Sequence, residues 1–301
     1  MDNVVVLLST YNGEKFLREQ IDSVLNQKDV NVQIIVRDDG SSDATIDILN
    51  EYKQSGKIVF YTGENKRTAQ SFMDLVYSSP DSDYYAFCDQ DDYWLPDKLS
   101  IGVEKIKAET DDVPILYYGM PRIVDEKLNP LYEDPPVCET MTTFNSCLVN
   151  SKATGCTMVF NRKLCELLKS SHPDYVLMHD AWAHKVCLAM DGKVIFDPDV
   201  HILYRQHGGN VVGVPKNFMG KIKLYYSEFQ KNDQMRSRCV QSLLDSYGDH
   251  MSSEKRRTAE IVANYRNDFR SKMKLFFNRE IKTDYRKRNL LYKLAVLFGK
   301  F

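Results

Sequence analysis

Three carboxylates, Asp89, Asp91 and Asp92, lie close together in the stretch AFCDQDDYWLPDKL, directly behind an apolar run. Acids this close repel one another unless solvent, a proton or a cation intervenes. Carboxylate oxygens are also the ligands that hard divalent cations prefer. The cluster is therefore either a solvated turn, where Asp is a common residue, or a metal site.

The acids follow the last of four predicted units in which an apolar strand, a polar turn and an amphipathic helix succeed one another. The predicted strands cover residues 4–9, 32–36, 58–61 and 84–88. The predicted helices cover residues 16–25, a segment through Ile46 and Leu49 that Ser42 or Asp43 would cap, and residues 69–77. This alternation predicts an α/β fold with a mostly parallel sheet and helices on both faces.

Polar residues follow three of these strands at their carboxyl ends, where open α/β sheets bind their ligands. These ends are Thr10-Tyr11-Asn12, Asp38-Asp39-Gly40 and Asp89–Asp92. Independent surface turns would have no reason to gather polar residues at one edge of a sheet. Their convergence favours a functional site over a solvated turn.

The second half of the chain has a different rhythm. Strands are predicted over residues 115–119, 157–160, 194–196 and 202–204, with a helix over residues 179–190. The loop at residues 125–150 is long for a compact domain, which predicts a lid, an acceptor-binding loop or a mobile connection. Beyond Pro215 the sequence turns helical and poor in glycine. We therefore predict an α/β domain over residues 1–215 and a helical appendage over residues 216–301.

The net charge of −2 hides an uneven distribution. Residues 253–301 hold 14 Lys or Arg and 5 Asp or Glu, a net of +9, which leaves −11 for the rest. The seven cysteines are scattered and never form a C-x-x-C pair, which favours a reducing cytosol over a disulfide framework or a zinc ribbon. No apolar stretch approaches the ~20 residues that a membrane span needs.

Six motifs in order along the chain resemble the sugar-nucleotide half of the family 2 glycosyltransferases, which have a GT-A fold. The motifs are LSTYNGEKFLREQIDSVLNQ, IIVRDDGSSDAT, FCDQDDYWLPDKL, ATGCTMVFNRKL, MHDAWAHKVC and LYRQHGGNVVG. The combination is most similar to the bacterial rhamnosyltransferases that build surface polysaccharide. The resemblance covers about residues 3–213 and implies that residues 1–215 are the catalytic domain.

The resemblance implies a metal site at the acidic cluster. Asp91 would bind a Mn²⁺ or Mg²⁺ ion, and Asp89 would contact either the ribose or the metal. His207 would complete the site, since a neutral imidazole is a good ligand for Mn²⁺; otherwise it is an ordinary loop histidine. Asp92 and Trp94 would shape the pocket for the donor sugar.

The resemblance also places the nucleotide. Asp39 would accept the imide N–H of uracil or thymine, whereas a structural reading makes the segment around it a turn and a helix cap. The residues that would cradle the nucleotide in the first turn are Thr10, Tyr11, Asn12 and Glu14. Arg67 stands where related chains often have Gly, and it either contacts the nucleotide or is a solvated surface residue.

Asp180 occupies the position at which inverting members of the family keep their general base. Transfer to a hydroxyl group needs a carboxylate to accept the proton, and a helix N-terminus favours the anion. His179 beside it would lie on the acceptor side. Trp182 either lines that side or belongs to the core.

The implied activity is an inverting, metal-dependent transfer of L-rhamnose from dTDP-L-rhamnose to a growing cell-surface polysaccharide or a lipid-linked glycan. A UDP-hexose donor is the first alternative. A sugar-1-phosphate nucleotidyltransferase is a weaker one, because residues 9–18 lack its Gly-rich triphosphate loop. We expect no nucleic-acid partner and a location in the cytoplasm, free or at the inner face of the plasma membrane.

The last segment, RKRNLLYKLAVLFGKF at residues 286–301, predicts a basic helix with an apolar face. Such a helix suits the surface of an anionic membrane. The alternative is that the apolar residues pack against the catalytic domain or a second subunit. The sequence leaves both open.

Overall fold

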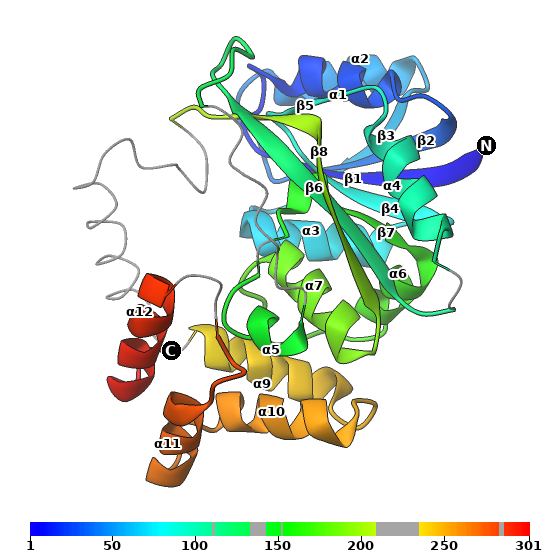
Figure 1. Ribbon diagram of the computed structural model, residues 1–301. Helices are drawn as coiled ribbons and strands as arrows, with labels where there is room; N and C mark the ends of the chain where they lie inside the picture. The colour runs from blue at the N-terminus through cyan, green and yellow to red at the C-terminus, as the bar shows by residue number, and fades with distance from the viewer. Residues whose placement is uncertain (110–111, 133–142, 152, 209–234, 283–285) are drawn as a thin grey trace.

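The computed structural model describes residues 1–109, 112–132, 143–151, 153–208, 235–282 and 286–301. Within these residues eight strands form one sheet in the order β3-β2-β1-β4-β7-β6-β8-β5 (Figure 1). The strands are β1 (Asp2–Thr10), β2 (Val30–Asp38), β3 (Ile58–Thr62), β4 (Tyr84–Asp89), β5 (Tyr93–Trp94), β6 (Ile115–Val124), β7 (Val159–Asn161) and β8 (Lys193–Arg205).

The first four strands are parallel, with β1 in the middle between β2 and β4. The short strand β7 runs antiparallel to β4 and β6, and β8 returns parallel to β6. A mostly parallel sheet is therefore confirmed. Because β1, β2 and β4 point the same way, their carboxyl ends bring Thr10, Asp38 and Asp89 to one edge.

The helices are α1 (Leu17–Leu25), α2 (Thr45–Gln54), α3 (Arg67–Ser78), α4 (Lys98–Lys107), α5 (Phe144–Cys147), α6 (Arg162–Lys169), α7 (His179–Ala189), α9 (Met235–Tyr247), α10 (Ser253–Ala263), α11 (Phe269–Phe277) and α12 (Arg286–Leu297). Helices α1, α2 and α4 cover one face of the sheet, and α3, α6 and α7 cover the other. Strand β1 serves both cores, because Val4 and Val6 point to one face while Val5 and Leu7 point to the other.

Two local predictions were wrong. The strands predicted at residues 194–196 and 202–204 form one continuous strand, β8, which pairs with β6 through a register shift near Met120. Between them Asp197 accepts a hydrogen bond from the backbone of Asp199 at 3.0 Å. This local bend at Asp-Pro-Asp resembles a turn in the sequence, although the strand continues through it. Neither Ser42 nor Asp43 is the N-cap of α2, because Ala44 occupies that position.

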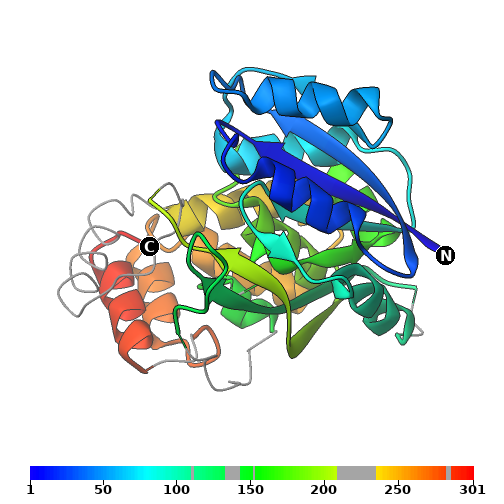
Figure 2. The ribbon, with the colours of Figure 1, turned by 90° about the horizontal axis from the view of Figure 1, so that it is seen from above.

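The C-terminal helices continue the core of the sheet. Helix α9 packs on α7, and α10, α11 and α12 follow in succession (Figures 1 and 2). Tyr292, Val296 and Phe301 belong to the same hydrophobic cluster as Trp182 of α7. The expected helical appendage is thus present and docks on the α/β part. Its predicted boundary at 215/216 lies outside the described residues, as does much of the long loop predicted at 125–150.

None of the described helices has both the length and the apolar character needed to span a bilayer.

Candidate active site

A cleft of about 610 Å³ opens at the carboxyl ends of β1, β2 and β4 and extends to the start of α7. Eight of the residues predicted from the sequence line it: Thr10, Tyr11, Asp39, Arg67, Asp89, Asp91, His179 and Asp180. They come from the two halves of the chain, since His179 and Asp180 follow the Asp cluster by about ninety residues. The cleft therefore has the acidic cluster on one side and the α7 N-terminus on the other.

Asp89 and Asp91 form the acidic side of the cleft. Burial, followed by the charges of Asp91 and Asp180, raises the pKa of Asp89 to about 8. The carboxylates of Asp89, Asp91 and Asp180 thus approach one another in a largely buried site. A divalent cation bound there would offset their repulsion.

His207 completes this acidic side. Its Nε2 lies 2.7 Å from Oδ2 of Asp91, and its ring packs on Phe16 with the ring centroids 5.1 Å apart. Carboxylate oxygen and imidazole nitrogen together form a donor set that suits Mn²⁺. The residues present therefore fit the expected metal, with Asp91 and His207 as ligands and Asp89 beside them.

Arg205 joins the chain segments that surround this donor set. Its Nε donates to the backbone oxygen of Asp91 at 2.8 Å, and its guanidinium also bonds to the backbone of Glu126 and to the carboxylate of Glu19. The guanidinium carbon lies 4.4 Å from the centroid of the Phe16 ring. Since His207 follows two residues later, Arg205 fixes the backbone from which the imidazole reaches Asp91.

Asp39 forms the nucleotide side of the cleft at the end of β2. It pairs with the buried guanidinium of Arg37 and accepts a hydrogen bond from Ser71. Arg37 also bonds to Asp74 of α3, with Nε 2.8 Å from Oδ2. These contacts hold the Asp39 carboxylate in one orientation beside the cleft.

Asp38, the neighbour of Asp39, has the structural role that the sequence left open. Its Oδ2 accepts hydrogen bonds from the backbones of Gly40 at 2.9 Å and Ser41 at 3.0 Å. Gly40 has φ +78°, a conformation that favours glycine. The turn therefore uses Asp38 and leaves Asp39 to face the cleft.

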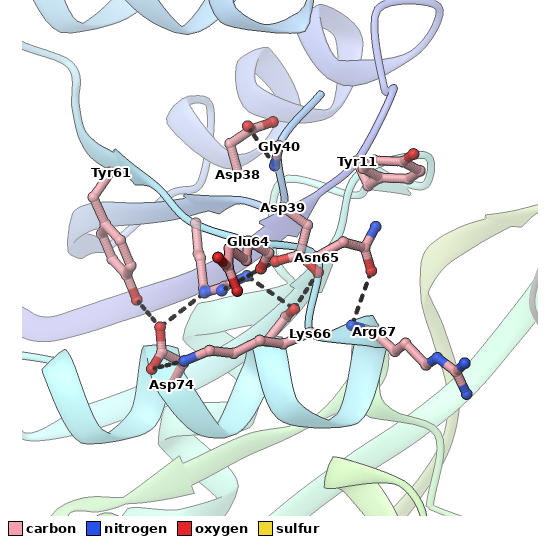
Figure 3. A network of polar contacts seen from close by, with 12 residues as sticks. Tyr11, Asp38, Asp39, Gly40, Tyr61, Glu64, Asn65, Lys66, Arg67 and Asp74 are labelled. Carbon is pink, nitrogen blue, oxygen red and sulfur yellow. Dashed lines mark hydrogen bonds and ion pairs between the residues drawn. The ribbon is translucent and has the colours of Figure 1, made fainter. Parts of the chain in front are cut away.

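Tyr11 and Arg67 lie near Asp39. Figure 3 shows the Tyr11 ring and the Arg67 side chain on either side of the Asn65 amide. The Tyr11 side chain is 47% exposed, so its ring offers a face to a planar ligand. Asn65 Oδ1 accepts a hydrogen bond from the backbone N–H of Arg67 at 3.1 Å, which supports the positive φ of 64° at Arg67.

Gln90 is a residue that the sequence argument missed. Its Oε1 accepts hydrogen bonds from Thr10 Oγ1 at 2.6 Å and from the Tyr11 backbone at 2.9 Å. It lies between Asp89 and Asp91, so it ties the first turn to the acidic loop. The signal that could have revealed it is its position at the middle of Asp-Gln-Asp, at the carboxyl end of a predicted strand.

Asp180 lies in the first turn of α7, as predicted. One carboxylate oxygen accepts a hydrogen bond from the backbone of Ala181 at 2.6 Å, and the other from the backbone of Gly155 at 3.1 Å. A Cβ at Gly155 would come within 2.6 Å of His179 Nε2, so only glycine allows this close approach. The base candidate is therefore held by two backbone N–H groups.

His179 also lines the cleft, and its ring stacks on Phe72 with centroids 3.8 Å apart. Burial lowers the pKa of His179 to about 4. The imidazole is therefore neutral near pH 7, and it contributes to the wall of the cleft rather than to its charge.

Besides His207, five predicted residues lie outside the cleft lining. Trp182 is fully buried and packs toward Tyr247 of α9, since it lies on the core face of α7. Asp92 is also buried, and its Oδ1 accepts a hydrogen bond from the Arg205 backbone at 3.1 Å. Trp94, expected beside Asp92, is buried as well, with the Lys98 amine 3.6 Å from the centroid of its ring.

Asn12 and Glu14 are the other two. Asn12 accepts a hydrogen bond from the Ser42 backbone at 2.8 Å, and Glu14 accepts one from the Ala44 backbone at 2.9 Å. They connect the turn after β1 to the turn after β2. They thus hold the two loops together and do not line the cleft.

Comparison with known proteins identifies the family. The model of glycosyl transferase family 2 matches residues 5–168. The dTDP-rhamnosyl transferase RfbG of Shigella flexneri is 27% identical over 236 residues, which cover 72% of this chain and 77% of RfbG. The UDP-Glc:alpha-D-GlcNAc-diphosphoundecaprenol beta-1,3-glucosyltransferase WfaP of Escherichia coli is 30% identical over 109 residues, 36% of this chain and 43% of WfaP.

Two solved structures are similar over 99% of this chain. Residues 1–349 of S. aureus TarS, solved with UDP-GlcNAc, align with a TM-score of 0.56 and 14% identity over 93% of that chain. The mannosyltransferase PcManGT of Pyrobaculum calidifontis, solved with GDP-Man and Mn²⁺, aligns with a TM-score of 0.56 and 15% identity over 86% of that chain. The fold is therefore the expected GT-A fold, and the chain belongs to glycosyl transferase family 2.

Proposed function

We propose that this glycosyltransferase moves L-rhamnose from dTDP-L-rhamnose to a hydroxyl group of a growing cell-surface polysaccharide or lipid-linked glycan, with inversion at the anomeric carbon. The observation that carries the proposal is that one cleft gathers Asp39, Asp91 and Asp180. The similarity to RfbG supports the choice of donor.

Asp39 would bind the nucleobase of the donor. Its carboxylate is an acceptor, held by Arg37 and Ser71, and would receive the imide N–H of thymine. Tyr11 would pack on the ring, and Arg67 would lie near the ribose or the phosphates as a positive charge. Such an acceptor also accommodates uracil, which has the same N–H group.

Asp91 and His207, with Asp89 beside them, would hold a Mn²⁺ or Mg²⁺ ion. When bound, the ion would neutralise the charge that develops on the departing diphosphate. The protein groups around it have a positional role, because Arg205 and Gln90 fix the loops that carry these ligands.

Asp180 would accept the proton of the acceptor hydroxyl as the new glycosidic bond forms. Its two backbone hydrogen bonds leave the carboxylate at the cleft wall, opposite the acidic loop. A base on the face of the sugar away from the diphosphate yields inversion, since the hydroxyl attacks from the side opposite the leaving group.

The acceptor side would be formed by His179 and the neighbouring cleft wall, without the contribution of Trp182 that the sequence left open. We keep the cytoplasm as the proposed location. The six cysteines within the described residues are buried and form no disulfide, which suits a reducing compartment.

A donor screen with product analysis tests the proposal. The full chain is incubated with Mn²⁺ and each of dTDP-L-rhamnose, UDP-glucose, UDP-GlcNAc and GDP-mannose, together with glycan acceptors. We expect dTDP release to be fastest and the product to have the inverted anomeric configuration. Preference for GDP-mannose, or binding of GDP but neither UDP nor dTDP, would contradict the role of Asp39.

A UDP-hexose donor is the second candidate. It is favoured by the similarity to WfaP, a UDP-Glc-dependent enzyme, and it requires no change in the assigned roles. The same screen separates the two donors, because a preference for UDP-glucose over dTDP-L-rhamnose would replace the first candidate while keeping the mechanism.

A further inference from the structure

The last helix, α12, is apolar on two opposite faces. One face carries Tyr292, Ala295 and Val296, which are buried against the neighbouring helices. The opposite face carries residues at the i, i+1, i+7, i+8 spacing of a helical stripe. They are Leu290, Leu291, Leu297 and, directly after the end of the helix, Phe298, with exposed fractions of 63%, 39%, 38% and 69%. A helix with apolar residues on both sides normally lies between two apolar neighbours.

Helix α11 extends this exposed surface. Phe269 and Phe277 are the first and last residues of α11 and are 75% and 68% exposed. Phe276 contacts Phe277 edge to face, with ring centroids 5.0 Å apart. Figures 1 and 2 both show α11 and α12 side by side at the end of the molecule remote from the N-terminus.

Two lysines join the two helices at this surface. Lys272 of α11 donates to the backbone oxygen of Leu297 at 3.4 Å, and the Lys293 amine of α12 lies 5.5 Å from the centroid of the Phe276 ring. The two helices that carry the exposed apolar side chains therefore contact each other at these lysines. We call the exposed apolar residues the α11–α12 patch: Phe269, Phe277, Leu290, Leu291, Leu297 and Phe298.

The segment that carries the patch has a strong net positive charge. Residues 269–301 contain ten Lys or Arg and two acidic residues, a net of +8 in a protein whose net charge is −2. Exposed aromatic and leucine side chains within a segment rich in lysine and arginine are the combination that binds the boundary between headgroups and acyl chains of an anionic bilayer.

We propose that the α11–α12 patch binds the surface of a membrane that contains anionic lipids. The apolar side chains enter the headgroup region, and the lysines and arginines contact the lipid phosphates. The protein attaches to the membrane by this surface without crossing it, and the buried face of α12 anchors the patch to the catalytic core.

The charge argues against a second copy as the occupant. A two-fold interface places the same patch on both partners, so each cluster of lysine and arginine would face its own copy. Like charges at an interface are unfavourable, whereas anionic headgroups complement the same residues. An anionic bilayer is therefore the partner that both the apolar and the charged residues favour.

The test is sedimentation of the full chain with vesicles of phosphatidylcholine, with and without phosphatidylglycerol. The test variant is L290E/F298E, which changes the two most exposed leucine and phenylalanine residues of the last segment, at 63% and 69%. The matched control is V59E/Y132E, which adds the same charge at residues that are 53% and 49% exposed elsewhere. Circular dichroism and thermal unfolding check that all three proteins are folded.

We expect the wild type and the control to bind anionic vesicles at low ionic strength, and L290E/F298E to bind at least about tenfold more weakly. Added salt should weaken the binding, and K272Q/K293Q should reduce both the affinity and the salt dependence. The measurement is independent of enzymatic activity, so it does not rest on the proposed donor.

Three outcomes would overturn the proposal. Equal binding of all variants would place the contact elsewhere on the chain, and equal binding to neutral vesicles would remove the role of anionic lipid. A wild-type protein that ignores vesicles would leave the patch to another occupant. Size-exclusion chromatography then separates a dimer that L290E/F298E dissociates from a monomer whose patch another part of the chain covers.

Discussion

The imidazole of His207 meets the carboxylate of Asp91 across 116 residues of chain, with Nε2 2.7 Å from Oδ2. Imidazole nitrogen and carboxylate oxygen are both ligand atoms for divalent cations. The contact therefore places two candidate ligands from distant segments side by side, where they would hold the metal together.

Replacing Asp91 by Asn should raise the Mn²⁺ concentration needed for half-maximal nucleotide binding by at least about tenfold, because the neutral amide is a weaker ligand. His207→Gln should have the same effect in smaller degree. Calorimetric titration of dTDP at several Mn²⁺ concentrations measures both. Asp174→Asn, a change at an exposed acid outside the cleft lining, should leave the titration unchanged. An Asp91→Asn protein with normal metal dependence would refute the assignment.

Arg205→Lys should destabilise the protein by about 1 to 3 kcal/mol, because an ammonium group cannot replace the planar fork that joins Asp91, Glu126 and Glu19. The dependence of nucleotide binding on Mn²⁺ should weaken as well, since His207 follows on the same backbone. Urea unfolding measures the first effect. Glu19→Gln removes only the charge of the half-exposed Glu19 carboxylate. It should lower the free energy of unfolding by less than about 1 kcal/mol. Equal costs for both variants would mean that the guanidinium does not organise the site.

Asp180→Asn should lower kcat by about 10² to 10⁴ while leaving the affinity for dTDP within about twofold. The amide oxygen can still accept one of the two backbone hydrogen bonds, so the geometry at Gly155 should persist. Pre-steady-state measurement of sugar transfer separates the chemical step from product release. Normal turnover by this variant, or a product with the donor's configuration, would remove Asp180 as the base.

Stability should fall as the pH drops below about 6.5, in part because of His184. Burial, with a smaller effect from Lys185, lowers the pKa of His184 to about 3. The unfolded chain, with an ordinary histidine pKa near 6.5, then binds a proton that the folded chain excludes. The contribution of His184 to the free energy of unfolding is therefore fully present above pH 6.5 and is lost between pH 6.5 and 3. From pH 7 to 5 the loss is about 2 kcal/mol.

Urea unfolding of the wild type and His184→Gln at pH 7 and pH 5 measures that contribution. The variant loses the hydrogen bond that joins Nδ1 to Ser151 Oγ at 2.8 Å, so it should be less stable at pH 7. Its further loss between pH 7 and pH 5 should be about 2 kcal/mol smaller than that of the wild type. An identical decline in both proteins would assign the pH dependence to other groups.

The periodicity of the sequence was sufficient to predict the edge of the sheet at which the candidate site lies. The apolar runs behind Thr10, Asp38 and Asp89 each became a parallel strand, because a buried strand in such a sheet is apolar on both faces. The contact between the Asp91 and His207 side chains could not be predicted from periodicity. It depends on β8 returning beside β6, a relation between distant segments that only resemblance to the family suggested.

The direction in which a side chain points was the weakest part of the sequence argument. Trp182 is three residues after His179 in the same helix, yet the packing of α9 turns it into the core. Asp92 follows Asp91 directly, yet it is buried and accepts a hydrogen bond from the Arg205 backbone, because the chain turns at Gln90 and Asp91. Spacing places such residues near a site, but the neighbouring elements decide which ones reach it.

The contact between Trp182 and Tyr247 also bears on the order in which the protein matures during synthesis. Helix α7 presents Asp180 at its first turn, but the face that carries Trp182 is covered by α9, which the ribosome makes later. We therefore expect a nascent chain that ends at residue 208 to have its sheet in place but its base poorly fixed. Limited proteolysis would compare ribosome-arrested chains that end at residue 208 with chains that include α9. We expect the chain that ends at residue 208 to be cleaved more easily within α7. Sugar transfer would then require α9 as well as the sheet and α7.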